Sequence, residues 1–219
     1  MRQWQRIACL GCLIVALSGL LTLGGCIVLF FQSTQREPEL PIRQFMQKQL
    51  EAFPPDWTVV IGGDIDYIYT DSDITWASWA VSATFWYKDG VRISPGIASA
   101  HEEIHVFRSA FMARITSYPS PSSLSVAEGY IPQGWSYRPP HADRFEFGCR
   151  GGNGRAQPEW CGFIVRYEEY IIVFDTPIAS YMTLEDLQRI MGVIDREMTD
   201  YLKRSTLRPG PRLVPTAIP

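Results

Sequence analysis

The longest stretch of this chain without a charged residue lies close to the N-terminus. Residues 7–31 read IACLGCLIVALSGLLTLGGCIVLFF, in which only Ser18 and Thr22 are polar apart from the cysteines. A helix of this length covers about 37 Å, more than the ~30 Å hydrocarbon core of a bilayer. The pattern therefore predicts a transmembrane anchor helix over residues 7–31, preceded by a short stub of residues 1–6.

Basic residues predict the orientation of this helix. Arg2 and Arg6 precede the apolar stretch with no acidic residue nearby, whereas acidic neighbours accompany Arg36, the first basic residue after it. By the positive-inside bias the N-terminus is expected in the cytoplasm, and residues 32–219 are expected to be extracytoplasmic.

Two alternatives for the apolar stretch remain. Residues 23–26, LGGC, resemble a lipoprotein signal in which Cys26 would carry the lipid, and a cleaved signal peptide is the other option. Both fit less well than an anchor, because the chain continues after Cys26 with five more apolar residues, IVLFF.

The hydrophobic spacing beyond the anchor changes several times. After a polar tether, residues 32–40, apolar residues at helical spacing predict three helices. These are residues 41–53, a helix that begins at Ser94 or Ser99 and ends before Pro119, and residues 183–203. β-Branched and aromatic runs with alternation predict strands. The expected strands are 57–69, 74–87, 91–93, 144–149 and 161–174.

The remaining segments are expected to be irregular. Residues 119–143 are rich in Ser, Pro and Gly and predict a long loop, with Trp135 and Tyr137 as its anchors on the core. The Pro-rich tail, residues 205–219, is expected to be disordered.

This order of elements predicts the α+β class. An N-terminal transmembrane helix is followed by one mainly antiparallel sheet with helices packed on a face. The expected domain, residues 41–204, is long enough to bury a single well-packed core.

Charge and cysteine content restrict the possible partners. The part after residue 31 holds all 23 acidic residues and eighteen of the 20 basic ones, so its net charge is −5. This balance argues against nucleic acid, which requires a basic footprint. Cys149 and Cys161 are the only cysteines outside the apolar stretch. In an oxidising compartment this pair predicts a disulfide, and two free buried thiols are the alternative.

One short motif suggests chemistry. Residues 101–105 read HEEIH. On a helix, His101 and His105 would share a face and could bind one Zn²⁺, while Glu102 would activate its water. The motif resembles the HExxH signature of zincin metallopeptidases, and Glu128 matches the third-ligand segment of the glutamate-type branch. The resemblance implies a membrane-tethered zinc metallopeptidase with His101, His105 and Glu128 as ligands and Glu102 as general base.

A solvated helix face is the competing interpretation of the same residues. Ser99 and Glu102 also form a capping-box pattern, which would use the Glu102 carboxylate on the backbone. Glu128 lies in a Pro- and Ser-rich stretch rather than on an expected helix. The preferred interpretation is therefore an anchored domain that binds an extracytoplasmic protein or a small molecule, without catalysis and without a cofactor.

Overall fold

A computed structural model describes most of the chain after the apolar stretch. The described residues are 18–19, 33–61, 77–87, 92–93, 96–116, 129–151 and 159–210. Ser18 and Gly19 are helical, and the rest of the expected anchor, residues 7–31, lies outside the described part. None of the helices in the described part is long and apolar enough to cross a membrane.

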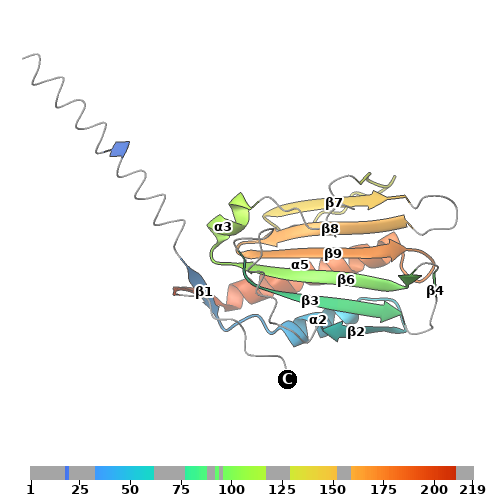
Figure 1. The fold of residues 1–219 in the computed structure, drawn as a ribbon, viewed down its shortest axis with the longest axis horizontal. Helices are drawn as coiled ribbons and strands as arrows, with labels where there is room; N and C mark the ends of the chain where they lie inside the picture. The colour runs from blue at the N-terminus through green and yellow to red at the C-terminus, as the bar shows by residue number, and fades with distance from the viewer. Residues whose placement is uncertain are drawn as a thin grey trace, which may run out of the picture.

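The centre of the domain is a six-stranded, fully antiparallel sheet with the strand order β2-β3-β6-β9-β8-β7 (Figure 1). Its strands are β2 (Trp57–Ile61), β3 (Ala77–Tyr87), β6 (Ser99–Phe107), β7 (Arg144–Arg150), β8 (Glu159–Tyr167) and β9 (Tyr170–Ile178). A small hairpin of β4 (Arg92–Ile93) and β5 (Gly96–Ile97) lies outside this sheet. The expected mainly antiparallel sheet is confirmed.

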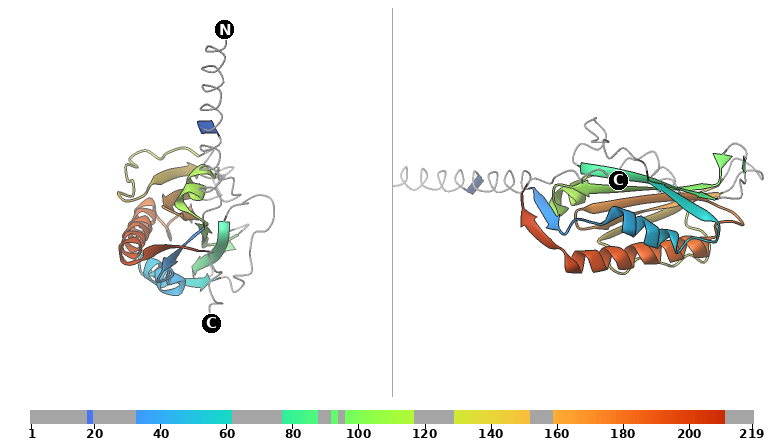
Figure 2. Two further views of the ribbon diagram at one scale, coloured as in Figure 1. Left: turned by 90° about the vertical axis from the view of Figure 1, so that its left-hand side faces the viewer. Right: turned by 90° about the horizontal axis from the view of Figure 1, so that it is seen from below.

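Two helices, α2 (Ile42–Leu50) and α5 (Leu184–Arg204), lie along one face of the sheet (Figure 2). Helix α5 begins where the sequence predicts it, because Thr183 and Asp186 form a reciprocal capping box. Its apolar stripe packs into the main core, which confirms the expected α+β arrangement of helices on a face. We call the side of the sheet opposite α2 and α5 the outer face.

The short helix α3 (Ala110–Ile115) packs on the outer face at one end of the sheet. Met112 and Ala113 of α3 belong to a second, smaller apolar cluster. The sheet residues of this cluster are Phe107, Ile164, Ile171 and Val173. Because successive strand residues point to opposite faces, strand β9 supplies both cores in alternation.

The helix expected from residue 94 or 99 onward is wrong over most of its length. Residues 99–107 form β6, an inner strand paired with β3 and β9, and of the described residues in this range only Ala110–Ile115 are helical. The strand expected at 161–174 is likewise two strands, β8 and β9, which reverse at Glu168, where φ is 50°. Strands β8 and β9 are buried on both faces over most of their length, so their sequence lacks the simple alternation of a half-exposed strand. Strand β6 alternates in burial, but its last four residues are all buried.

The domain also begins earlier and ends later than expected. In the segment expected to be a tether, β1 (Thr34–Glu37) pairs with β10 (Thr206–Pro209) from the expected disordered tail. Arg36 connects this pair to the β8–β9 turn through Glu169, with 2.8 Å between Nε and Oε1. Residues 211–219 of the expected tail lie outside the described residues.

The described part of the expected loop is irregular, and the expected disulfide is present. Residues 129–143 contain no helix or strand apart from a bridge between Tyr130 and Cys149, and Trp135 stacks on Phe147 with 4.0 Å between ring centroids. Cys149 and Cys161 lie opposite each other in β7 and β8 and are joined by the expected disulfide. Closing this loop stabilises the fold by ~3 kcal/mol in the chain-entropy description.

Candidate functional site

The zincin-like motif does not have the geometry that zinc binding requires of it. Its residues lie on strand β6, where positions four apart are about 13 Å apart rather than one helical turn. His101 and His105 point to the outer face, whereas Glu102 points to the face that α2 and α5 cover. The proposed general base is thus on the opposite side of the sheet from the proposed ligands, and Glu128 lies outside the described residues.

Glu102 has a structural environment instead. It is fully buried against α2, where Gln49 Nε2 donates a hydrogen bond of 3.1 Å to Glu102 Oε1. Burial raises the pKa of Glu102 to about 8, and the hydrogen bond from Gln49 lowers it only in part. Glu102 Oε2 and Gln49 Oε1 are also buried, with no hydrogen-bond partner among the described atoms. A protonated Glu102 can donate to the amide oxygen, so we interpret the two side chains as a neutral acid–amide pair.

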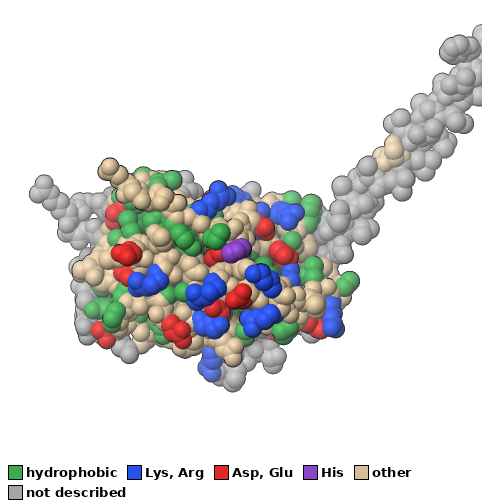
Figure 3. Space-filling model, turned by 180° about the vertical axis from the view of Figure 1, so that it is seen from behind, with side chains coloured by type: hydrophobic (Ala, Val, Ile, Leu, Met, Phe, Trp, Pro, Cys, Tyr) green, Lys and Arg blue, Asp and Glu red, His purple; other side chains and the backbone are tan. Residues whose placement is uncertain are grey.

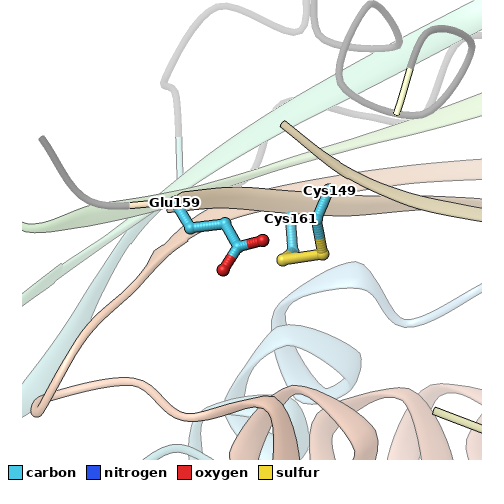
Figure 4. Close-up of side chains that lie close together, drawn as sticks. All are labelled: Cys149, Glu159 and Cys161. Carbon is cyan, nitrogen blue, oxygen red and sulfur yellow. A yellow bond between two sulfur atoms is a disulfide. The ribbon is translucent and has the colours of Figure 1, made fainter. Parts of the chain in front are cut away.

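A second group of potential ligands lies around the disulfide. Within the described part of the chain, Cys149, Glu159 and Cys161 are the one set of three such side chains whose ligand atoms come within 4.8 Å of one another. Figure 4 shows the Glu159 carboxylate beside the two bonded sulfur atoms. Metals bind cysteine as the thiolate, and a disulfide offers none. In the oxidised protein this group is therefore not a metal site.

The outer face carries a cluster of polar side chains from three neighbouring strands. We call Ser82, His101, Glu103, His105 and Asp175 the outer-face cluster. Ser82 of β3 lies opposite Glu103 of β6, and His101 of β6 lies opposite Asp175 of β9. Three of these side chains are partly buried, Ser82 is exposed, and His105 is fully buried.

Short contacts connect most of this cluster. His105 Nε2 is 2.9 Å from Glu103 Oε2, and His101 Nε2 is 2.8 Å from Ser82 Oγ. His101 Nδ1 lies 3.9 Å from Glu103 Oε1. Glu103 is therefore placed between the two imidazoles on one strand, as residues two apart on a face of β6 must be.

The pKa values of the two carboxyl groups of the cluster are shifted in opposite directions. Burial alone would raise the pKa of Glu103, but the hydrogen bond from His105 and the charges of both imidazoles together lower it. The pKa of Asp175 is raised to about 7, mainly by burial and also by repulsion from Glu103, against a smaller lowering by Arg150. Asp175 is thus a carboxyl group that changes charge near neutral pH.

The backbone packs closely beside Asp175 at a glycine of the next strand. Gly162 of β8 lies next to Asp175, and its own partner on β7 is Gly148. A Cβ at Gly162 would lie 2.7 Å from the carbonyl oxygen of Phe174 and 3.3 Å from Asp175 Cβ, so only glycine fits there. Asp175 Oδ1 is buried without a hydrogen-bond partner among the described residues. A buried hydrogen-bond acceptor therefore lies against the closely packed backbone at Gly162.

Sequence reasoning missed Asp175 and assigned Glu103 no role. The available signal for Asp175 was a lone carboxylate directly after the apolar run Tyr170–Phe174. Its nearness to His101 and Gly162 depends on strand register, which the sequence does not display.

The comparisons with known proteins add no further constraint. No protein-family model matches the chain, and no curated protein or solved structure is significantly similar to it. The fold and the outer-face cluster are therefore the basis for a functional proposal.

Proposed function

We propose that this chain is a single-pass membrane protein whose extracytoplasmic domain binds a ligand at the outer-face cluster, without catalysing a reaction. The apolar stretch of residues 7–31 supports the anchor, and the basic residues before it support the orientation. The Cys149–Cys161 disulfide fits an oxidising compartment. Asp175 is the observation that supports binding.

Asp175 Oδ1, which has no hydrogen-bond partner in the described part of the chain, favours a ligand with a donor group. A buried polar atom without a hydrogen bond costs on the order of 1–3 kcal/mol. A ligand that brings an N–H or O–H group to Asp175 Oδ1 removes this cost. A carboxylate with further hydrogen-bond acceptors nearby favours amines. The expected ligand is therefore a small molecule, or the amino end of a peptide, with a cationic nitrogen.

This proposal is tested by ligand-induced stabilisation of the full chain in detergent. Ethanolamine, lysine and glucosamine serve as amine probes at pH 8, above the pKa of Asp175 near 7. A probe that binds the folded state is expected to raise the melting temperature by roughly 2–4 °C per kcal/mol of binding energy. The Asp175→Asn variant, which lacks the charge, is expected to lose this rise.

Glu146→Gln is the matched control for Asp175→Asn. Glu146 also lies on the outer face, but it already forms an ion pair with Arg144. Its variant is expected to respond to the probes like the wild type. Equal responses in Asp175→Asn and the wild type, or no response to any of the three amines, would rule out Asp175 as the binding group.

The anchor and its orientation have a separate test. In intact cells or spheroplasts, added protease is expected to remove a tag placed after Pro219, because residues 32–219 are expected outside the cytoplasm. Alkylation under denaturing, non-reducing conditions is expected to leave Cys149 and Cys161 unlabelled. A tag that stays protected until lysis contradicts the orientation, and labelling of both cysteines contradicts export to an oxidising compartment.

A further inference from the structure

The point where the chain enters the domain lies beside helix α3. Both the backbone N–H and the hydroxyl of Thr34 donate to the carbonyl oxygen of Arg108, at 2.8 and 3.1 Å. The N–H of Gly210 donates to the carbonyl oxygen of Ser33 at 3.0 Å. The expected anchor ends at Phe31, so fewer than three residues separate it from these contacts. Figure 1 shows α3 and β1 at the same end of the domain.

The entry point is also held firmly. The Arg36 side chain is buried and bonded to Glu169 and Ser205, which fixes β1 against the β8–β9 turn and the end of α5. A flexible linker would let the domain move freely away from the membrane, but the strand begins at Thr34. The end of the domain that carries α3 must therefore stay close to the bilayer that holds residues 7–31.

Helix α3 exposes two large apolar side chains. Met112 and Ala113 are buried against the sheet, whereas Phe111 and Ile115 are 41% and 47% exposed. Arg114 is also exposed, so the outward side of α3 is apolar with one cation beside it. Exposed aromatic and aliphatic groups beside arginines are typical of segments in the headgroup region of a bilayer.

Basic side chains around the entry point also fit the headgroup region of a bilayer. Arg108 is exposed next to the contact with Thr34, and Lys203 and Arg204 are exposed at the end of α5. On the helix-covered side, Lys and Arg side chains, interspersed with Asp and Glu, extend to the right-hand end of the domain (Figure 3). Guanidinium groups bind phosphate oxygens in a bidentate manner, so these side chains match lipid phosphates.

We propose that helix α3, together with Arg108, lies on the phospholipid surface of the membrane that holds the anchor. Phe111 and Ile115 enter the boundary between headgroups and acyl chains, and Arg108 and Arg114 contact the lipid phosphates. This inference rests on the proposed anchoring of residues 7–31, but not on ligand binding at the outer-face cluster. It fixes which end of the domain faces the bilayer.

Photo-crosslinking of the full chain in lipid vesicles tests this contact. The chain is reconstituted in phosphatidylcholine and phosphatidylglycerol with p-benzoylphenylalanine in place of Phe111. The matched control carries the same group in place of Val60, which is 56% exposed and thus more accessible than Phe111. Val60 pairs with Thr84 of β3. Thr84 is seven residues along β3 from Ala77, which pairs with Phe107 near α3. Val60 is therefore ~23 Å from the α3 end of the sheet.

The expected result is at least a tenfold higher yield of phospholipid adduct at position 111 than at position 60, measured by mass spectrometry. Position 115 serves as a second site if the group at position 111 prevents folding, judged by the melting temperature. An alkaline carbonate wash separates the two proposals. Loss of the chain from the vesicles overturns both the anchoring and the α3 contact. Retention without a lipid adduct, or with an adduct to a second copy of the chain, overturns the α3 contact alone.

Discussion

Replacing Arg36 by alanine is expected to destabilise the domain by about 3–5 kcal/mol, the usual cost of removing one partner of a buried ion pair. Glu169 is fully buried, and Arg36 is almost fully buried, so water cannot replace the lost guanidinium. Arg36 also donates to Ser205 Oγ at 3.3 Å and pairs with Glu168. The variant therefore leaves a buried carboxylate at the β8–β9 turn without its ion-pair partner.

Urea unfolding of the full chain in detergent, followed by tryptophan fluorescence, measures this effect. Arg208→Ala is the matched control, because Arg208 pairs with Glu37 at 2.8 Å in the same two-stranded sheet but both side chains are exposed. An exposed pair contributes at most about 1 kcal/mol, so this control is expected to unfold nearly like the wild type. Similar losses in the two variants would show that the buried pair has no special role.

Glu102 is expected to make the folded protein less stable as the pH rises from about 4.5 to 8. Its pKa is raised from 4.5 to about 8 by burial, so the folded chain keeps a proton that the unfolded chain releases. Folding then binds a proton in this range, and linkage requires stability to fall with pH. The fall is complete above pH 8, where both states are ionised. Its upper bound is about 5 kcal/mol, at ~1.4 kcal/mol per pKa unit.

Glu102→Gln is expected to remove about half of the total fall in stability with pH, because glutamine keeps the shape but cannot ionise. The free energy of unfolding, measured from pH 4 to pH 9, gives the comparison. Asp175, whose pKa is raised from 3.8 to about 7, contributes a fall of the same sign with an upper bound of about 4 kcal/mol, which Glu102→Gln retains. Glu185→Gln, at an exposed position in the first turn of α5, is the control and is expected to keep the wild-type profile. An unchanged pH dependence in Glu102→Gln would mean that Glu102 is already ionised in the fold.

Elements with strong local signals were predictable from the sequence. Helix α5 has a capping box at Thr183 and a sustained apolar stripe, and both act within a few residues. The disulfide followed from there being only two cysteines after the apolar stretch, and the α+β class followed from the order of the patterns. The anchor at residues 7–31 and its orientation remain predictions.

The incorrect predictions of secondary structure have a common physical cause. Residues 99–107 can match either a helix or a strand, and hydrogen bonds to β3 and β9 decided for the strand. The polar β1 has little apolar pattern of its own and is held by a partner strand about 170 residues later. Local propensity is weaker than such long-range pairing, so tertiary contacts override it.

The sequence by itself thus determined the apolar stretch, the class of the domain, its last helix and its covalent cross-link. Only the tertiary structure decided that the HEEIH motif is a strand, that Glu102 faces the core, and that Asp175 lies beside His101 and Gly162. The reason is that a strand alternates its side chains between two faces, while strand register alone determines which residues of different strands meet on a face.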